Sequence, residues 1–153
     1  MKEWDGFTSA AALLPPPMRE RAMALGADKR ARAEELRLRV GRPASVLLPE
    51  GEVVPGHSDL PPTVTQTDLE QLCGAVTDYS RYAAGETLSR GYLTARGGFR
   101  VGVCGTAVLR EGVNTNLRDI SSVTVRIGRE QPGLGDEVLS QLFREGRFCS
   151  TVL

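Results

Sequence analysis

Two arginines of the 153-residue sequence are placed where they could bind an anion such as a phosphate group. Arg100 lies in the segment FRVGV (99–103), and Arg126 lies in the segment VTVRI (123–127). Alternate residues of a strand face opposite sides of a sheet, so both guanidinium groups point away from the apolar side. If the strands are neighbours, the two arginines share one polar face beside Gly102, whose missing side chain would leave room for a ligand. Because guanidinium groups bind phosphate oxygens through paired, charge-assisted hydrogen bonds, the pattern predicts a phosphate-binding face.

The same residues allow two other interpretations. The arginines could form ion pairs with acids such as Glu86 or Asp119, or they could simply be solvated. The glycines at 102 and 105 could mark a β-bulge, or a helix packed closely over the sheet, instead of a ligand site.

No other residues form a known catalytic or metal-binding pattern. The three cysteines, at 73, 104 and 149, include no C-x-x-C pair, and His57, the only histidine, lies in a Pro-rich loop. The phosphate-loop pattern G-x-x-x-x-G-K-[ST] and the zinc-protease pattern H-E-x-x-H are both absent from the sequence. We therefore expect no disulfide framework, a reducing cytoplasm, and no catalytic residue, metal ligand or cofactor within this chain.

Composition limits the kinds of partner. Lys and Arg together number 19, as do Asp and Glu, so the net charge is zero and general attraction to nucleic acid is not expected. No apolar run approaches the roughly 20 residues of a membrane span, and we expect a chain without a secretion signal.

Alternating apolar residues predict an α+β fold, in which antiparallel β-hairpins form a sheet packed by three to four short helices in a single domain. Gly97-Gly98 predicts a two-residue hairpin turn with positive φ at both positions. The predicted strands are 36–40, 46–48, 92–96, 99–109 and 120–127.

Helical spacing and capping residues predict the helices. The segments 50–65 and 110–119 are polar or rich in Pro and Gly, which predicts loops. The predicted helices are 18–25, opened by a triple proline; 67–79, with a T-x-x-E capping box at Thr67 and Glu70; 82–90; and 136–145, which starts at Asp136 and stops before Gly146.

The apolar stripes of these elements predict one shared core. We expect the chain to divide into a poorly patterned segment (1–17), an α+β domain (18–147) and the start of a strand (148–153), an apolar run that ends without a turn, charge or cap. In the last helix, residues 138, 139, 142 and 143 are predicted to face inward. The predicted core contains Leu36, Leu38, Val76, Val101, Val103, Val125 and Leu142.

Three motifs carry a resemblance to a known family. They are EELRLRVGRP (34–43), SRGYLTARGGFRVGVCGTAV (89–108) and LRDISSVTVRIGRE (117–130). In this order and separation they resemble the N-terminal part of the stage III sporulation protein AA family, and the resemblance covers roughly 18–153. Members continue from a strand like FCSTVL (148–153) into a phosphate-binding loop and an ATPase domain related to the type II and type IV secretion ATPases. The resemblance implies that this chain stops just before that loop.

The resemblance also implies a function. The parent protein would be an ATPase, using ATP and Mg²⁺, in the mother-cell cytoplasm or peripherally at the forespore membrane, and it would power the channel between mother cell and forespore. This chain would be its non-catalytic regulatory and assembly domain. The implied partners are its own ATPase domain, neighbouring subunits of a hexameric ring, and channel proteins, with no direct contact to nucleic acid.

The same resemblance extends to the arginines. In the related secretion ATPases, arginines of the N-terminal domain approach the phosphates of the nucleotide, and GGFRVGV (97–103) resembles the hairpin that carries one of them. Arg100 and Arg126 are therefore candidates for nucleotide-phosphate contact, and Arg118 and Arg129 are further candidates.

Two other classes of function remain open. A nucleic-acid-binding module could use Arg96, Arg100 and Arg126, and its oligonucleotide binding would then depend steeply on salt. A small-ligand-sensing domain could use the glycine-rich sheet face as a pocket, and a small molecule would then copurify with it.

Overall fold

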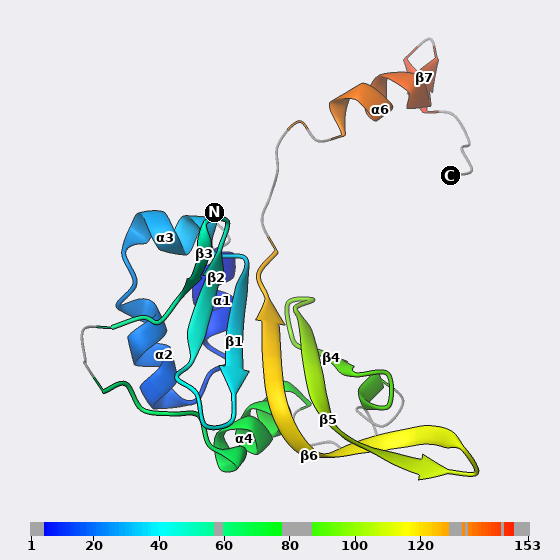
Figure 1. The fold of residues 1–153 in the computed structure, drawn as a ribbon. Helices are drawn as coiled ribbons and strands as arrows, with labels where there is room; N and C mark the ends of the chain where they lie inside the picture. Colours follow the sequence, from blue (N-terminus) through cyan, green and yellow to red (C-terminus); the bar gives the residue numbers. More distant parts are fainter. Residues whose placement is uncertain are drawn as a thin grey trace.

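The computed structural model describes residues 5–56, 60–77, 87–128, 133, 135–144 and 146–148 (Figure 1). The described helices are α1 (Gly6–Ala11), α2 (Pro16–Met23), α3 (Ala27–Arg32), α4 (Gln66–Val76) and α6 (Asp136–Leu142). The described strands are β1 (Glu35–Arg39), β2 (Ser45–Leu48), β3 (Gly51–Val53), β4 (Tyr92–Thr94), β5 (Arg100–Arg110), β6 (Val113–Arg126), β7 (Phe143–Arg144) and β8 (Arg147–Phe148).

Six of these strands form one antiparallel sheet in the order β3-β2-β1-β6-β5-β4. The central strands pair in register, with Leu36 opposite Val125 and Val101 opposite the same valine on the other side. Figure 1 shows α1 and α2 behind β1 to β3 and α4 below the central strands. The predicted α+β fold with antiparallel hairpins is confirmed.

The core lies between this sheet and the helices, and the alternation in the sequence predicted most of it. Burial alternates along β5 and β6 and at the residues next to their ends. The buried positions are 99, 101 and 103 on one side and 123, 125 and 127 on the other, and the residues between them are exposed or half-buried. Six of the seven predicted core residues belong to one buried cluster: Leu36, Leu38, Val76, Val101, Val103 and Val125.

The prediction for Leu142 is wrong. Leu142 is not among the residues of the buried cluster or packed against it, and α6 ends there because Phe143 begins β7. Val138 and Leu139 of α6 are 48% and 51% exposed, and Phe143 is exposed too, so they do not face inward. Figure 1 shows α6 and β7 away from the six-stranded sheet, so the sheet does not cover the apolar stripe of this helix.

The N-terminal residues contribute more than their weak pattern indicated. Asp5 caps α1 by accepting a hydrogen bond from the backbone N–H of Thr8 (3.1 Å). A hydrogen bond from the Thr8 hydroxyl is the main cause that lowers the pKa of Asp5, and the backbone hydrogen bond lowers it further. Phe7 and Ala10 of α1 are buried in the same core cluster as Leu36. A six-residue helix such as α1 is too short for a hydrophobic period to be recognised in the sequence.

The capping box of α4 lies two residues earlier than predicted. Thr65, not Thr67, is the N-cap, because its hydroxyl accepts from the backbone N–H of Asp68 and the Asp68 carboxylate accepts from the backbone N–H of Thr65 (2.8 Å). The sequence TQTDLE (65–70) allows a capping box from Thr65 to Asp68 or from Thr67 to Glu70. The structure has the first, in which Asp68 is the third helical residue.

The segment 110–119, predicted as a loop, is part of a long two-stranded ribbon. β5 and β6 continue beyond the sheet as a hairpin, which we call the distal ribbon (104–120), and Figure 1 shows it projecting from the body. Its turn residues Glu111 and Gly112 both have positive φ, at 52° and 80°, as the tight turn of a hairpin requires. Both faces of the ribbon are largely exposed, so its sequence lacks the apolar alternation that marks a half-buried strand.

The remaining loop prediction is correct only in part. Within 50–65, Gly51 to Val53 form the edge strand β3, and Val64 is buried and bridges to Val40. His57, and most of the predicted helix 82–90, lie outside the described residues. In the part of the chain that the structure describes, no helix is long and apolar enough to cross a membrane.

Candidate functional site

The β4–β5 hairpin turn forms the edge of a shallow hollow. Gly97 and Gly98 have φ of 84° and 80°, a conformation that glycine adopts without strain, so the predicted positive φ at both positions is confirmed. The turn is one residue longer than predicted, because Ala95 and Phe99 are joined by a backbone hydrogen bond of 2.9 Å. The longer turn places the glycines beside the ends of β5 and β6.

Arg100 and Arg126 come together at this hollow, as the sequence predicted for neighbouring strands. Val101 pairs with Val125, so the next residue outward on each strand places the two arginines opposite each other. We call the hollow the arginine hollow; it has a volume of about 200 Å³ and is lined by Gly97, Gly98, Phe99, Arg100, Arg126 and Gly128.

Neither arginine is neutralised by an acid of the described chain. Arg100 stacks on Tyr92, with its guanidinium carbon 4.4 Å from the centre of the ring. Stacking uses the face of the guanidinium plane and leaves the N–H groups at its edge available to an anion. Within the described residues, no ion pair involves Arg100 or Arg126, and both side chains are exposed. The hollow can therefore offer two cationic donors to one anionic ligand.

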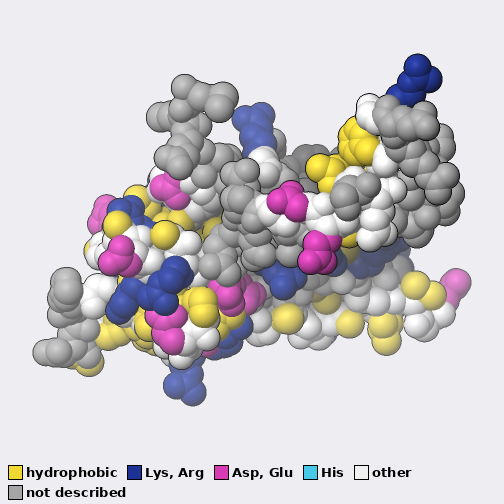
Figure 2. Space-filling model, turned by 90° about the horizontal axis from the view of Figure 1, so that it is seen from above, with side chains coloured by type: hydrophobic (Ala, Val, Ile, Leu, Met, Phe, Trp, Pro, Cys, Tyr) yellow, Lys and Arg dark blue, Asp and Glu magenta, His cyan; other side chains and the backbone are white. Residues whose placement is uncertain are grey.

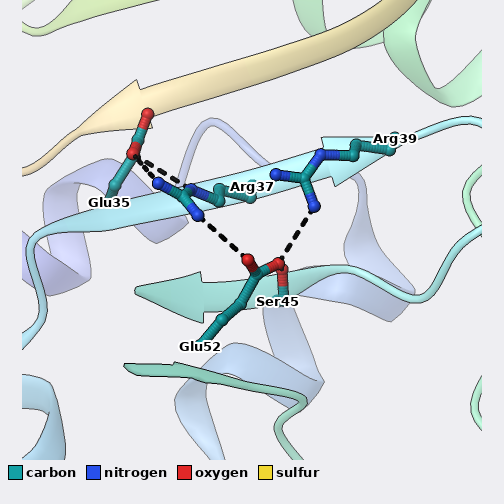
Figure 3. Close-up of polar contacts among 5 residues, drawn as sticks. All are labelled: Glu35, Arg37, Arg39, Ser45 and Glu52. Atoms are coloured by element: carbon teal, nitrogen blue, oxygen red, sulfur yellow. Dashed lines mark hydrogen bonds and ion pairs between the residues drawn. The ribbon is translucent and has the colours of Figure 1, made fainter. Parts of the chain in front are cut away.

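The acid directly opposite Arg126 in the sheet is held by another residue. Glu35 of β1 is the register partner of Arg126 on β6, so the two side chains lie on the same face. Yet Glu35 accepts two hydrogen bonds from Arg37, from Nε at 3.1 Å and Nη2 at 3.0 Å, both on the same carboxylate oxygen. Figure 3 shows the Glu35 carboxylate turned to Arg37 along its own strand.

Glu52 completes a network of charged residues on this side of the sheet. Its carboxylate bridges Arg37 Nη1 at 2.9 Å and Arg39 Nη1 at 3.2 Å, and it also accepts from the Ser45 hydroxyl (Figure 3). The hydrogen bond from Ser45 is the largest cause that lowers the pKa of Glu52, ahead of the bond from Arg37. Arg37 is thus fixed by two carboxylates, and its side chain is only 24% exposed.

The glycines of β5 at 102 and 105 leave space for atoms of the neighbouring strand β6. A Cβ at Gly102 would lie 2.7 Å from Oγ1 of Thr124, and a Cβ at Gly105 would lie 2.6 Å from the carbonyl oxygen of Arg118. The pairing register of β5 and β6 shifts between Cys104 and Thr106, so Gly105 lies at a β-bulge. Of the interpretations that the sequence left open, the bulge is correct at Gly105.

Of the two further candidate arginines, Arg118 is not part of this hollow. Arg118 lies on the distal ribbon, eight residues along β6 from Arg126 or roughly 26 Å at 3.3 Å per residue. Its Nε is 3.4 Å from the carboxylate of its neighbour Asp119, and both side chains are highly exposed. Arg129, and Glu86, one of the acids that could pair with the arginines, lie outside the described residues.

Residues that the sequence pattern did not single out complete the surroundings of the hollow. Tyr92, Glu35 and Arg37 occupy the same sides of their strands as Arg100 and Arg126, opposite buried neighbours such as Leu36. The alternation of charged and apolar residues in ELRLR was the available signal, but strand order was needed to connect it to Arg126.

Cys73 provides no reactive group to this site. Burial raises the pKa of the Cys73 thiol to about 11, and Cys73 packs against the core, as the sequence predicted.

Lys and Arg side chains alternate with Asp and Glu side chains on the face that Figure 2 shows, and the basic side chains do not form a continuous patch there.

Fold and site together define the class of protein: an α+β domain whose sheet presents an arginine-lined hollow. Residues 17–153 match the family model described as "Sporulation stage III, protein AA", and the chain belongs to this family. The resemblance drawn from the three sequence motifs is thereby confirmed.

One curated relative agrees with the family assignment. "Stage III sporulation protein AA" of Bacillus subtilis (strain 168) is 32% identical over 134 residues, which are 88% of this chain and 42% of that protein. The chain therefore spans less than half of the length of this curated relative. Among solved structures, the X-ray structure of the Legionella pneumophila ATPase DotB is similar, with a TM-score of 0.41 and 19% identity over 83% of this chain and 35% of that chain.

Proposed function

We propose that this chain is the regulatory and assembly domain of a longer sporulation ATPase, and that its arginine hollow contacts the phosphates of a nucleotide held by the rest of that protein. Membership of the sporulation family supports the biological setting. The observation that carries the phosphate contact is the pairing of Arg100 and Arg126 in one hollow, without a described acid on either.

The geometry suits a phosphate better than a planar organic ligand. Two guanidinium groups at one hollow can each donate hydrogen bonds to different oxygens of the same phosphoryl group or of adjacent ones. The Gly97-Gly98 turn carries no side chains, so it leaves the approach to these donors open. Each charge-assisted contact of this kind contributes about 1.5–3 kcal/mol when the partner is an ion.

ATP and Mg²⁺ would belong mainly to the rest of the protein in this proposal. Arg100 and Arg126 fit a role in holding phosphate oxygens, and nucleotide hydrolysis would supply the energy for movement. The sequence has no phosphate-binding loop. The described residues contain no group of three His, Cys, Asp or Glu side chains that could hold a metal ion. Catalysis and metal binding are therefore proposed for the ATPase domain.

The proposed partners follow from this division of labour. An arginine that reaches a nucleotide from a separate domain can report whether the nucleotide is present, because the contact forms only when the phosphates are bound. We propose that this contact adjusts the position of the domain against its own ATPase domain and against neighbouring subunits of a ring. The forespore channel proteins are the proposed recipients of that movement.

The test uses the full-length protein with Arg100→Ala and Arg126→Ala. Both side chains are exposed and away from the core, so we expect folded variants whose ATP affinity or turnover falls about tenfold or more. Arg110→Ala is the matched control, since it removes an exposed arginine from the distal part of the same β5 strand. Fluorescence titration with an ATP analogue measures affinity, phosphate release measures turnover, and sedimentation measures assembly.

The proposal is wrong if both hollow variants keep the affinity, turnover and assembly of the Arg110→Ala control. A salt-dependent association with oligonucleotides that Arg100→Ala and Arg126→Ala abolish would instead favour a nucleic-acid-binding role.

A further inference from the structure

We propose that Arg37 keeps the arginine hollow open to anions by holding Glu35 away from Arg126. This inference rests on the proposed function, because it concerns what prevents the protein's own carboxylate from occupying the phosphate site. It assigns Arg37 a positioning role, because Arg37 is not itself a lining residue of the hollow and acts through Glu35.

Sheet register places Glu35 where it could neutralise Arg126. The two residues are directly opposite on β1 and β6, and residues opposite each other in an antiparallel pair have Cβ atoms about 4.5–5.5 Å apart on the same face. Glutamate and arginine side chains are both long enough to meet across that separation, and opposite charges at such positions attract each other. An ion pair between Glu35 and Arg126 is therefore the expected arrangement for these two residues alone.

The structure shows a different pairing. Glu35 bonds to Nε and Nη2 of Arg37 at 3.1 and 3.0 Å, and no ion pair joins Glu35 to Arg126 within the described residues. The Glu35 side chain is only 21% exposed, so its carboxylate is partly shielded from water. Arg37 competes successfully because two of its N–H groups converge on one oxygen.

Arg37 is itself fixed from the other side. Its Nη1 donates to Glu52 at 2.9 Å, and Glu52 is held in turn by Arg39 and by the Ser45 hydroxyl. Hence Arg37 has little freedom to release Glu35, and the orientation of Glu35 is determined three strands away from the hollow, on β3. Figure 3 shows this chain of contacts running from Glu35 through Arg37 to Glu52.

The arrangement has a consequence for charge at the hollow. With Glu35 engaged by Arg37, Arg126 faces the hollow with its full positive charge beside Arg100. Without Arg37, Glu35 could swing to Arg126, and a phosphate would have to displace it. An exposed ion pair of this kind lowers the affinity for a competing anion about two- to fivefold.

The test compares four variants of the full-length protein by titration with the fluorescent nucleotide mant-ATP: Arg37→Ala, Arg39→Ala, Arg126→Ala and a double variant that combines Glu35→Gln with Arg37→Ala. Arg37→Ala should weaken binding about two- to fivefold. Arg39→Ala, which removes a positive charge from the same strand and leaves the Glu35–Arg37 contact in place, should change it less. The double variant Glu35→Gln, Arg37→Ala should recover the affinity of Arg39→Ala, because no carboxylate remains to occupy Arg126. Denaturation midpoints of all variants establish that they are folded.

Each result distinguishes this inference from the proposed function. If Arg126→Ala binds mant-ATP as tightly as the parent protein, the phosphate site does not exist and the inference falls with it. If Arg126→Ala weakens binding but Arg37→Ala equals Arg39→Ala, the phosphate site stands and the positioning role of Arg37 is refuted. If Arg37→Ala weakens binding and Glu35→Gln in the same protein does not restore it, Arg37 acts only through its own charge, and the inference is again refuted.

Discussion

Gly105 is the residue whose substitution tests the described packing of the β5–β6 ribbon most directly. In Gly105→Ala, the new Cβ would lie 2.6 Å from the carbonyl oxygen of Arg118, 3.1 Å from Cα of Ile120 and 3.3 Å from the carbonyl oxygen of Asp119. The shortest contact is about 0.4 Å inside the 3.0 Å that real Cβ atoms keep from other atoms. All three atoms belong to the backbone, so no side chain can rotate away to relieve the overlap.

The magnitude follows from two opposing terms. Overpacking that forces backbone shifts costs about 1–3 kcal/mol. Replacing glycine by alanine also restricts the unfolded chain, which favours the folded state by about 0.4–1 kcal/mol. We therefore expect Gly105→Ala to lower the free energy of unfolding by about 1–2 kcal/mol. The bulge at this position also sets the direction in which the distal ribbon leaves the sheet, so amide signals of the ribbon should shift.

Urea denaturation followed by circular dichroism measures the effect, with Gly26→Ala as the control. Gly26 has a φ of −57° and an added Cβ there would meet nothing within 4 Å, so its substitution should not lower stability by more than about 0.5 kcal/mol. Equal midpoints for the Gly105 variant and the parent chain would refute the described approach of the Arg118 backbone to Gly105.

Three further predictions concern the core, the nucleotide and pH. Leu38→Ala should cost about 2–5 kcal/mol because Leu38 is fully buried, whereas Leu142→Ala should cost less than about 1 kcal/mol, and similar denaturation midpoints for the two would contradict the described core. The isolated 153-residue chain should neither hydrolyse ATP nor bind it tightly, since it lacks a phosphate-binding loop, and turnover that survives repurification in a phosphate-release assay would show otherwise. The pKa of Glu52 is lowered from 4.5, chiefly by the Ser45 hydroxyl, so its contribution to stability is present above about pH 4.5 and is lost as the pH falls through the lowered folded-state value. Glu52→Gln should therefore flatten the acid side of the stability profile, and an unchanged profile would argue against the Glu52 network.

The sequence predicted those parts of the fold in which one face of an element is buried. Val101 and Val125 alternate with polar residues because their strands have one side in the core, and this period was sufficient to place Arg100 and Arg126 on the other side. The distal ribbon was missed for the same physical reason, since neither of its faces is buried and its residues carry no period. In α6 the period is present, but the described sheet does not cover it, so the inward prediction failed at Leu142.

The features of the candidate site also separate into those that the sequence predicted and those that required the structure. The sequence by itself determined the residue types at the hollow, the glycine turn with positive φ, and membership of the sporulation family through three ordered motifs. Only the tertiary structure decided which strands are neighbours. That order made Arg100 and Arg126 a pair, left Arg118 far along β6, and brought Glu35 opposite Arg126 while Arg37 held it back. Pairing between β1 and β6 joins residues about 90 positions apart in the chain, and such a contact depends on how the whole sheet assembles and not on any local pattern.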